Sequence, residues 1–236
     1  FLDNLPRKFR DHMESYQILE HRGRDREVIK KEMASDGKNT EFDQKEFLES
    51  KFVKKYWDAR VFGNTFLEGK GNKGFLKTGV VQFGIGVSVS PISILRHTNT
   101  NKAGVETGKN SGMAPLAFRV VEHGVYCMPF FVNPNYAHKS GCTADDIELL
   151  KLLIPYAYDL NRSSIRPDVR IRHAWYVEHK NVLGSCPEHL ILEALTPDRV
   201  GNTNDPSISW KDYIDKTELP QELAERVSSV VDLVNL

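Results

Sequence analysis

A metal site is the first chemistry that the cysteines and histidines of this 236-residue chain suggest. Cys186 and His189 stand three residues apart, and His173 lies six residues before His179. A structural or catalytic zinc ion needs three or four ligands that converge on one point. A single Cys-x-x-His pair without a second pair nearby does not supply them. The sequence therefore predicts neither a metal nor another cofactor.

Catalytic motifs are equally sparse. The chain contains no nucleophile elbow, no phosphate-binding Walker loop and no zinc-protease helix motif. Gly84 and Gly86 lie in a strand-like stretch rather than before a helix, so they do not form a dinucleotide fingerprint. Asp145 and Asp146 follow Thr143 at a predicted helix start, where carboxylates complement the helix dipole. We therefore expect the protein not to be an enzyme.

Cationic side chains gather in four places and point to a different chemistry. The clusters are Arg7, Lys8 and Arg10; Lys70, Lys73 and Lys77; Arg96, His97, Lys102 and Lys109; and Arg162, Arg166, Arg170 and Arg172. Most surface lysines and arginines are simply solvated, and each cluster taken alone is first interpreted that way. Two of the clusters fall on glycine-rich loops, where cations and backbone N–H groups suit sequence-independent binding of a sugar-phosphate chain.

Composition sets limits on the partners and the compartment. The 32 basic and 32 acidic residues balance, which argues against a polybasic protein but not against a local basic groove. The part from Pro197 onward carries eight acids and four bases, so the preceding part has the positive surplus. Three widely spaced cysteines suit a reducing cytoplasm. No apolar run is long enough to predict a membrane span, so we expect a cytoplasmic protein without a membrane partner.

The elements that must position these residues are read from periodicity. Residues 80–90 alternate between apolar and small or polar side chains, which predicts one strand with an almost bare face. Further strands are predicted at residues 117–132 and 170–179, and helices at 43–56, at 143–158 with a kink at Pro155, and at 220–236. The polar stretch 96–115 is either an extended hairpin or a disordered excursion. This order indicates an α+β fold, the class of RRM-like nucleic-acid platforms.

Several short stretches occur in order across residues 56–195. They are DARVFG at 58–63, TGVVQ at 78–82, SPI at 90–92, HGVY at 123–126, the helix at 143–153, DLNRSS at 159–164 and LGSCPEH at 183–189. Each is unspecific alone, but together they resemble the Cas-seven family, the backbone subunit of the CRISPR Cascade surveillance complex. The closest resemblance is to the subtype I-C and I-B branch.

This resemblance implies an RRM-like (ferredoxin-like) palm with a mostly antiparallel sheet, helices on one face and a long thumb hairpin. It implies one RNA-binding domain over residues 1–236, with a helical insertion at about 18–55, the thumb at about 95–117 and a C-terminal helical tail at about 197–236. Copies of the subunit would form a filament along a CRISPR guide RNA, beside other Cascade subunits. Target DNA would be read through pairing with the guide.

The resemblance also indicates which residues contact RNA. The expected set is Arg7, Lys8, Arg10, Lys77, Gln82, Arg96, His97, Met113, Arg162 and Arg166. Arg96 and His97 would mark the root of the thumb. Met113, near its far end, is a candidate wedge between bases, or equally a residue that anchors the hairpin to its own domain. The family has Arg-Gly-Pro where this chain has Lys77-Thr78-Gly79-Val80, which weakens the assignment of Lys77.

Two departures from the family lie at the start of the chain. The family begins with a strand and a glycine- and asparagine-rich loop that this chain lacks. It also has a further stretch between the equivalents of Arg7 and Lys8. We therefore expect that an N-terminal strand and a segment between these two residues are missing from this sequence.

Two other functions stay open at this point. Related type III backbone subunits cut target RNA with a loop aspartate, so a metal-dependent nuclease using a residue such as Asp58 is one alternative. A protein–protein scaffold without nucleic acid is the other. Co-purified RNA and binding that weakens steeply with salt would separate the RNA-binding reading from the scaffold.

Overall fold

The computed structural model describes residues 16–18, 48–49, 51–63, 78–102, 113–159 and 162–235. Its named helices and 3-10 turns are α4 (Lys51–Lys55), α5 (Trp57–Phe62), η3 (Pro134–Tyr136), α6 (Ala137–Ser140), α7 (Ala144–Leu153), η4 (Ile154–Tyr156), α8 (Glu188–Leu195), η5 (Trp210–Asp212) and α9 (Gln221–Ala224). Its strands are β1 (Val81–Phe83), β2 (Val87–Ser88), β3 (Ile94–Lys102), β4 (Met113–Val121), β5 (Tyr126–Cys127), β6 (Phe130–Val132), β7 (Trp175–His179), β8 (Asp198–Arg199), β9 (Tyr213–Ile214) and β10 (Val227–Asp232).

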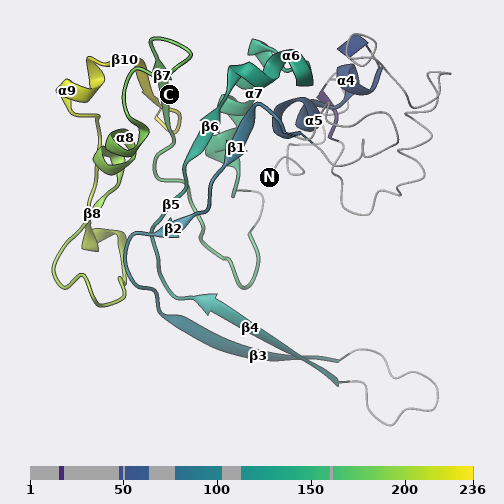
Figure 1. Ribbon diagram of the computed structural model, residues 1–236. Coiled ribbons are helices and arrows are strands. Elements are labelled where there is room, and N and C mark those ends of the chain that lie inside the picture. Colours follow the sequence, from purple (N-terminus) through teal and green to yellow (C-terminus); the bar gives the residue numbers. More distant parts are fainter. Residues whose placement is uncertain are drawn as a thin grey trace, which may run out of the picture.

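The architecture is α+β, as predicted from the order of elements. Within the described residues the strands form five two-stranded ladders, and every one of them is antiparallel. The pairs are β1 with β6, β2 with β5, β3 with β4, β7 with β10, and β8 with β9. In Figure 1 most elements gather in one body, and the β3–β4 hairpin extends away from it.

Two apolar clusters hold the body together. The larger one packs helices α5 and α7 against β1 and the β7–β10 ladder, and includes Trp57, Val61, Val81, Leu150 and Leu233. The smaller one lies between α8 and β10 and includes Cys186, Ile191, Leu219 and Val227. Burial of such side chains is the main favourable term in folding. The body is therefore a packed platform from which the hairpin projects.

Helix α7 begins where the sequence predicts, because Thr143 and Asp146 form a capping box. The Thr143 hydroxyl accepts a hydrogen bond from the Asp146 N–H at 3.3 Å, and the Asp146 carboxylate accepts one from the Thr143 N–H at 2.9 Å. Two N–H groups at the helix start are thereby satisfied. The predicted continuation to residue 158 is wrong, since the α-helix ends at Leu153. Pro155 lies in the 3-10 turn that follows, because it has no N–H to extend the helix.

The single strand predicted over residues 80–90 is also wrong. It is divided into β1 and β2, and between their ladders one chain advances four residues while the other advances three. Such an extra residue is a β-bulge, and a one-residue slip moves the following side chains to the other face. Val81 is therefore buried, whereas Ile85 and Val87 are 84% and 64% exposed. The apolar side of the predicted strand is therefore open from Phe83 onward, since Phe83 is itself 38% exposed.

Three other expected elements are corrected. The strand predicted at residues 117–132 consists of the end of β4 followed by β5 and β6, and the strand predicted from residue 170 begins at Trp175. The helix predicted at 220–236 is only one turn, Gln221–Ala224, and β10 follows it. β10 pairs antiparallel with β7, and the register shifts between Val227 and Ser229.

Candidate nucleic-acid interface

The polar excursion is built as a β-hairpin. Residue pairing between β3 and β4 runs without a break from Ile94 opposite Val121 to Lys102 opposite Met113. The connecting residues 103–112 lie outside the described part of the chain. Nine paired positions of extended chain carry the ladder well away from the body, as Figure 1 shows. The described β3 side chains, at residues 94–98, are all exposed, and none belongs to the two apolar clusters.

The register places two arginines side by side on this hairpin. Arg96 is directly opposite Arg119, both side chains are exposed, and no partner for either guanidinium is found among the described residues. Like charges directly opposite in an antiparallel pair repel each other. An anion bound between them would remove that repulsion, and a guanidinium matches a phosphate with two parallel hydrogen bonds. The pair is therefore a candidate site for a phosphate group.

Arg119 was not among the residues expected from the sequence. It lies in a stretch read only as strand, 23 residues after Arg96. The signal that could have found it is the pairing of a hairpin, since two positions become neighbours only once the register is known. Without the turn residues fixed, a one-residue error would have put Arg119 on the other face.

His97 lies on the face of the hairpin opposite to Arg96, because side chains alternate along a strand. It is paired with Phe118, and its neighbours in the ladder include Leu95 opposite Val120. The face that carries Arg96 also carries Ile94 opposite Val121 nearer the body, so only one face has the arginine pair but both faces have apolar residues near the root. Arg96 and His97, both expected at the thumb root, are exposed there, but they do not serve one and the same ligand group.

Gln82, Arg162 and Arg166 are exposed on the body. Gln82 lies in β1 opposite Phe131 of β6. Arg162 and Arg166 flank a tight turn in which Ser163 and Arg166 exchange backbone hydrogen bonds of 3.2 and 2.9 Å. Neither arginine has a described ion-pair partner, whereas Arg170 in the same loop donates to Asp168 at 2.6 Å. The loop therefore offers two arginines that are available to an external anion.

The remaining expected contacts cannot be placed on this surface. Arg7, Lys8, Arg10 and Lys77 lie outside the described residues. Met113 is described in its backbone alone, at the far end of the ladder opposite Lys102. The proposed break between Arg7 and Lys8 also falls outside the described part. These predictions stay predictions.

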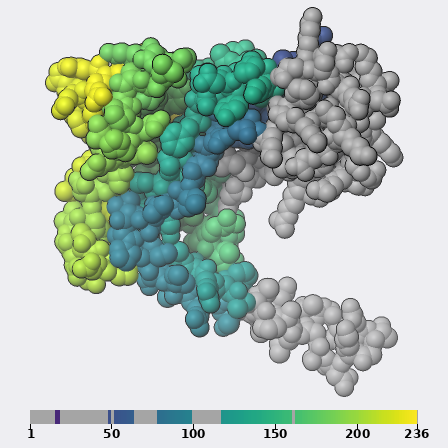
Figure 2. Space-filling model, viewed as in Figure 1, coloured from purple at the N-terminus to yellow at the C-terminus, as the bar shows by residue number. Residues whose placement is uncertain are grey.

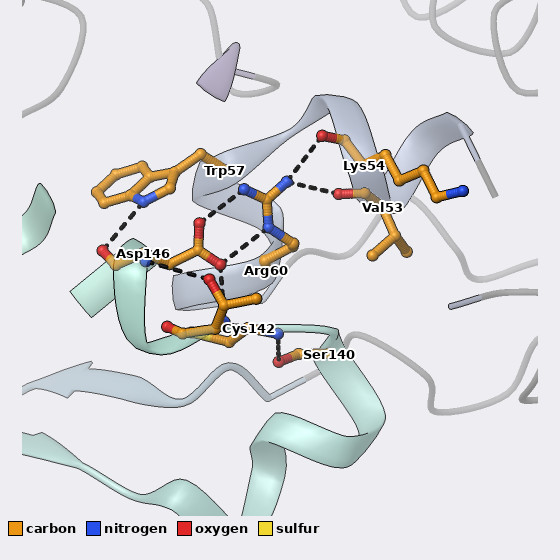
Figure 3. A network of polar contacts seen from close by, with 8 residues as sticks. Val53, Lys54, Trp57, Arg60, Ser140, Cys142 and Asp146 are labelled. Atoms are coloured by element: carbon orange, nitrogen blue, oxygen red, sulfur yellow. Dashed lines mark hydrogen bonds and ion pairs between the residues drawn. The ribbon is translucent and has the colours of Figure 1, made fainter. Parts of the chain in front are cut away.

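The stretch DARVFG, which carries much of the family resemblance, builds the interior instead. Arg60 is 6% exposed and forms two hydrogen bonds to the Asp146 carboxylate, at 2.7 and 3.1 Å. Its remaining amino group donates to the carbonyls of Val53 and Lys54, at 2.6 and 3.0 Å, as Figure 3 shows. The Trp57 indole donates to the Asp146 carbonyl at 3.1 Å. This buried network joins α4, α5 and α7.

Three cysteine and histidine side chains of the described residues bear on the question of chemistry, namely Cys142, Cys186 and His189. Burial raises the pKa of the Cys142 thiol to about 12, with a further contribution from the Asp146 charge that Arg60 partly offsets. That thiol stays protonated at neutral pH and is a poor nucleophile. Cys186 is buried in the smaller apolar cluster, whereas His189 is exposed, so the two do not converge. Among the described residues no three potential ligands gather as a metal site would require.

His173 is held by two carboxylates. Its Nδ1 lies 2.7 Å from Asp232 and its Nε2 lies 2.9 Å from Asp215, while its ring stacks on Trp175. Burial opposes the charged imidazole, but the hydrogen bonds and negative charges of Asp232 and Asp215 outweigh it and raise the pKa of His173. This cluster ties β10 to the segment after β9 and belongs to the body's structure rather than to a ligand site.

Comparison with known proteins identifies the family of this chain. No helix in the described residues combines the length and the apolar character that crossing a membrane requires. A search of the curated proteins found no match. The family model of CRISPR-associated protein Cas7 matches residues 4–218, which is most of the chain. The chain therefore belongs to the Cas7 family of CRISPR-associated proteins, the backbone subunits of CRISPR effector complexes.

Proposed function

We propose that this protein is the guide-RNA-binding backbone subunit of a type I Cascade complex, related to the I-C and I-B branch. The single observation that carries the proposal is the unpartnered Arg96–Arg119 pair on a hairpin that extends from the body. Family membership supplies the context, because backbone subunits work along an RNA. The arginine pair supplies the chemistry, because two adjacent guanidinium groups suit one phosphodiester.

The described surface supports a division of labour along the RNA. The body, which we assign as an RRM-like palm, offers Gln82 and the exposed Arg162 and Arg166. The β3–β4 hairpin, which we assign as the thumb, offers Arg96 and Arg119 on one face. Contacts of this kind go to the sugar-phosphate backbone and carry no sequence information. Target DNA is then selected by base pairing with the guide rather than by side chains.

Copies of the subunit are the second partner we propose. Ile85, Val87, Tyr126 and Met128 are exposed around the bulge between β1 and β2, at the root of the hairpin. Val87 pairs with Cys127 and Ser88 pairs with Tyr126, so Val87 and Tyr126 lie on opposite faces of the β2–β5 ladder. Exposed apolar side chains are typical of protein–protein contact sites. We assign this surface to the neighbouring copy along the guide.

We further propose that the subunit binds RNA without cutting it. Asp58, the aspartate considered for a nuclease, is 6% exposed and lies in α5 rather than in an open loop. A carboxylate that holds a catalytic metal has to face substrate and solvent. The alternative predicts metal-dependent cleavage of RNA that is lost in Asp58→Asn. A cleavage assay with magnesium or manganese, run beside the same assay with chelator, decides between the two.

Salt dependence of RNA binding tests the proposal directly. The protein is titrated with a guide-length single-stranded RNA at several salt concentrations, and the Arg96→Gln/Arg119→Gln double variant is measured beside it. Loss of the one phosphate that the pair holds is expected to reduce the slope of log K against log salt by about 0.7. Arg170→Gln is the matched control, because that arginine already has Asp168 as partner. A wild-type protein that does not bind RNA, or a double variant with an unchanged slope, overturns the proposal.

A further inference from the structure

A chain of hydrogen bonds fastens both ends of the β3–β4 hairpin to a distant part of the sequence. The Ser90 hydroxyl lies 2.5 Å from the Tyr213 hydroxyl. The Tyr213 hydroxyl donates to the Ser207 hydroxyl at 2.8 Å, and Ser207 lies 2.8 Å from Nδ1 of His123. With one hydrogen on each hydroxyl, Ser90 donates to Tyr213 and Ser207 donates to His123. We call these four residues the root clamp.

The four clamp residues come from both ends of the hairpin and from the segment around β8 and β9. Ser90 lies four residues before β3 begins, and His123 lies two residues after β4 ends, so each stands at one foot of the hairpin. Ser207 and Tyr213 belong instead to the segment around β8 and β9. Figure 2 shows this yellow-green segment packed against the blue segment that leads to the hairpin. The motifs SPI and HGVY, unexplained by RNA contact, provide the two feet.

Three of the four clamp residues are buried. Ser207 is 2% exposed, Tyr213 is 6% and Ser90 is 7%. A buried hydroxyl that loses its partner is not rescued by bulk water, so each member favours the arrangement that satisfies the others. The Tyr213 ring is also fixed by stacking on Trp210 and by the Arg199 guanidinium 5.5 Å from its centre.

Other contacts hold the two feet to each other. The added Cβ of an alanine at Gly124 would lie 2.9 Å from the Tyr126 ring and 3.2 Å from Ile92, so the two feet are closely packed against each other. Backbone hydrogen bonds from Glu122 to Ser93 and from Val89 to Val125, at 3.0 and 2.8 Å, continue the pairing of the feet into the β2–β5 ladder. The hairpin itself contributes no residue to either of the two clusters described above. Among the described residues, the clamp is therefore a buried polar link between the hairpin feet and the C-terminal segment.

We propose that Ser207 and Tyr213 are positioning residues that fix the angle of the hairpin over the body. This proposal rests on the proposed function, in which the hairpin and the body grip the same RNA strand. The arginine pair on the hairpin and the exposed arginines of the body then reach consecutive phosphates only while the root is held. The C-terminal segment acts on RNA binding through Tyr213 and Ser207 without touching the RNA.

Hydrogen exchange of the RNA-free protein tests the clamp. Tyr213→Phe keeps the packed ring and removes two hydrogen bonds, and Ser207→Ala removes the link between Tyr213 and His123. Peptides that cover residues 88–95 and 120–126 are expected to exchange about tenfold faster in both variants, while peptides from the β7–β10 ladder stay unchanged. Tyr156→Phe, at an exposed tyrosine, is the matched control. Unchanged exchange at the feet, or an equal rise throughout the protein, overturns the clamp.

RNA binding by the same variants tests the positioning role. Each variant is titrated with guide-length RNA and with a trinucleotide too short to span the hairpin and the body. We expect affinity for the long RNA to fall about tenfold and affinity for the trinucleotide to stay unchanged. Loosened feet with unchanged affinity for the long RNA overturn the positioning role. A wild-type protein without RNA affinity would overturn the proposed function alone, because the exchange result is obtained without RNA.

Discussion

Arg60 in the body and the Arg96–Arg119 pair on the hairpin show two opposite uses of the same side chain. Arg60 is buried, with a carboxylate and two carbonyls that satisfy its donors. Arg96 and Arg119 are exposed, face each other across a ladder and have no partner among the described residues. The first arrangement is complete within the chain, whereas we propose that the second is completed by an anion from outside.

This difference separates residues that make the fold from residues that we expect to bind. Arg60 belongs to the stretch that most strongly suggests the family, yet every donor direction observed for it points inward (Figure 3). The hairpin arginines lie in stretches with little motif character. A family resemblance therefore locates the scaffold first, and the binding groups have to be found from exposure, charge and missing partners.

The largest expected effect on the free energy of unfolding comes from removing the buried Arg60–Asp146 ion pair. In Arg60→Met the Asp146 carboxylate, 1% exposed, loses its ion pair, and we expect a loss of about 3–5 kcal/mol in the free energy of unfolding. Arg60→Lys keeps the charge but offers fewer donors in a different geometry, so it is expected to recover only part of that loss. Urea unfolding followed by circular dichroism measures both. Arg96→Met is the matched change on the hairpin, and we expect it to cost less than about 0.5 kcal/mol. Equal losses at the two positions would remove the distinction.

Reversing one charge of the Arg96–Arg119 pair tests whether the pair binds an anion. Arg119→Glu places a carboxylate opposite Arg96, and we expect it to stabilise the ladder by about 0.2–1 kcal/mol. The same change fills the anion site from within, so affinity for RNA is expected to fall by about tenfold or more. Thermal unfolding and RNA titration are measured on one preparation, with Arg119→Gln as the neutral control. A variant that gains stability and keeps its RNA affinity would show that the pair does not hold phosphate.

The sequence predicts the parts of this fold that depend on local chemistry. Thr143 with Asp146 three residues later is a capping signal that needs no tertiary information, and the start of α7 is correct. The polar stretch that forms the hairpin permits two interpretations from the sequence, an extended hairpin or a disordered excursion, because its ladder depends on a register that no single residue encodes. Arg119 was missed for the same reason.

Where long-range pairing changes the periodicity, the sequence prediction fails. Pro129 has no N–H to give to the ladder and stands opposite Gly84, whose N–H donates to its carbonyl at 2.8 Å, and there the strand of residues 80–90 is interrupted. In the C-terminal part, Val227 and Val230 are three residues apart, which suggests a helix. The register shift between Val227 and Ser229 gives a strand the same spacing, so periodicity alone could not separate the two.

The cluster of His173 with Asp215 and Asp232 is only partly buried, and so is intermediate between the buried Arg60 and the exposed hairpin arginines. Because the pKa of His173 is raised, its contribution to stability is fully present below its unfolded pKa and is lost as the pH rises through its folded pKa. Burial opposes ionisation of Asp232, but the hydrogen bonds from Ala174 and His173 outweigh it and lower its pKa, so its contribution is lost as the pH falls through its folded pKa. His173→Gln is expected to cost about 1–2 kcal/mol near pH 6 and much less near pH 9. Chemical unfolding at both pH values measures this, with exposed His189→Gln as control, and a loss independent of pH would contradict it.

The smallest expected effect is the difference between Arg166 and Arg170, which lie in one loop. Arg166 and Arg170 are both exposed, but among the described residues only Arg170 has a carboxylate partner, since its Nε lies 2.6 Å from Asp168. An arginine that is already neutralised gains less from a phosphate, because binding has to break or share the existing pair. We expect Arg166→Gln to reduce the slope of log K against log salt by about 0.7, the value for one phosphate contact on a single strand, and Arg170→Gln to change it by much less.

Stability supplies the control for this last pair. The turn around Arg166 is held by its backbone hydrogen bonds with Ser163, which do not depend on the side chain, so neither variant is expected to alter the unfolding midpoint. Any difference in RNA binding is then a difference in surface charge alone. If Arg170→Gln reduced the slope as much as Arg166→Gln, a partner carboxylate would not distinguish structural from binding arginines. The hairpin pair would then have to be judged by its position on the molecule rather than by its lack of partners.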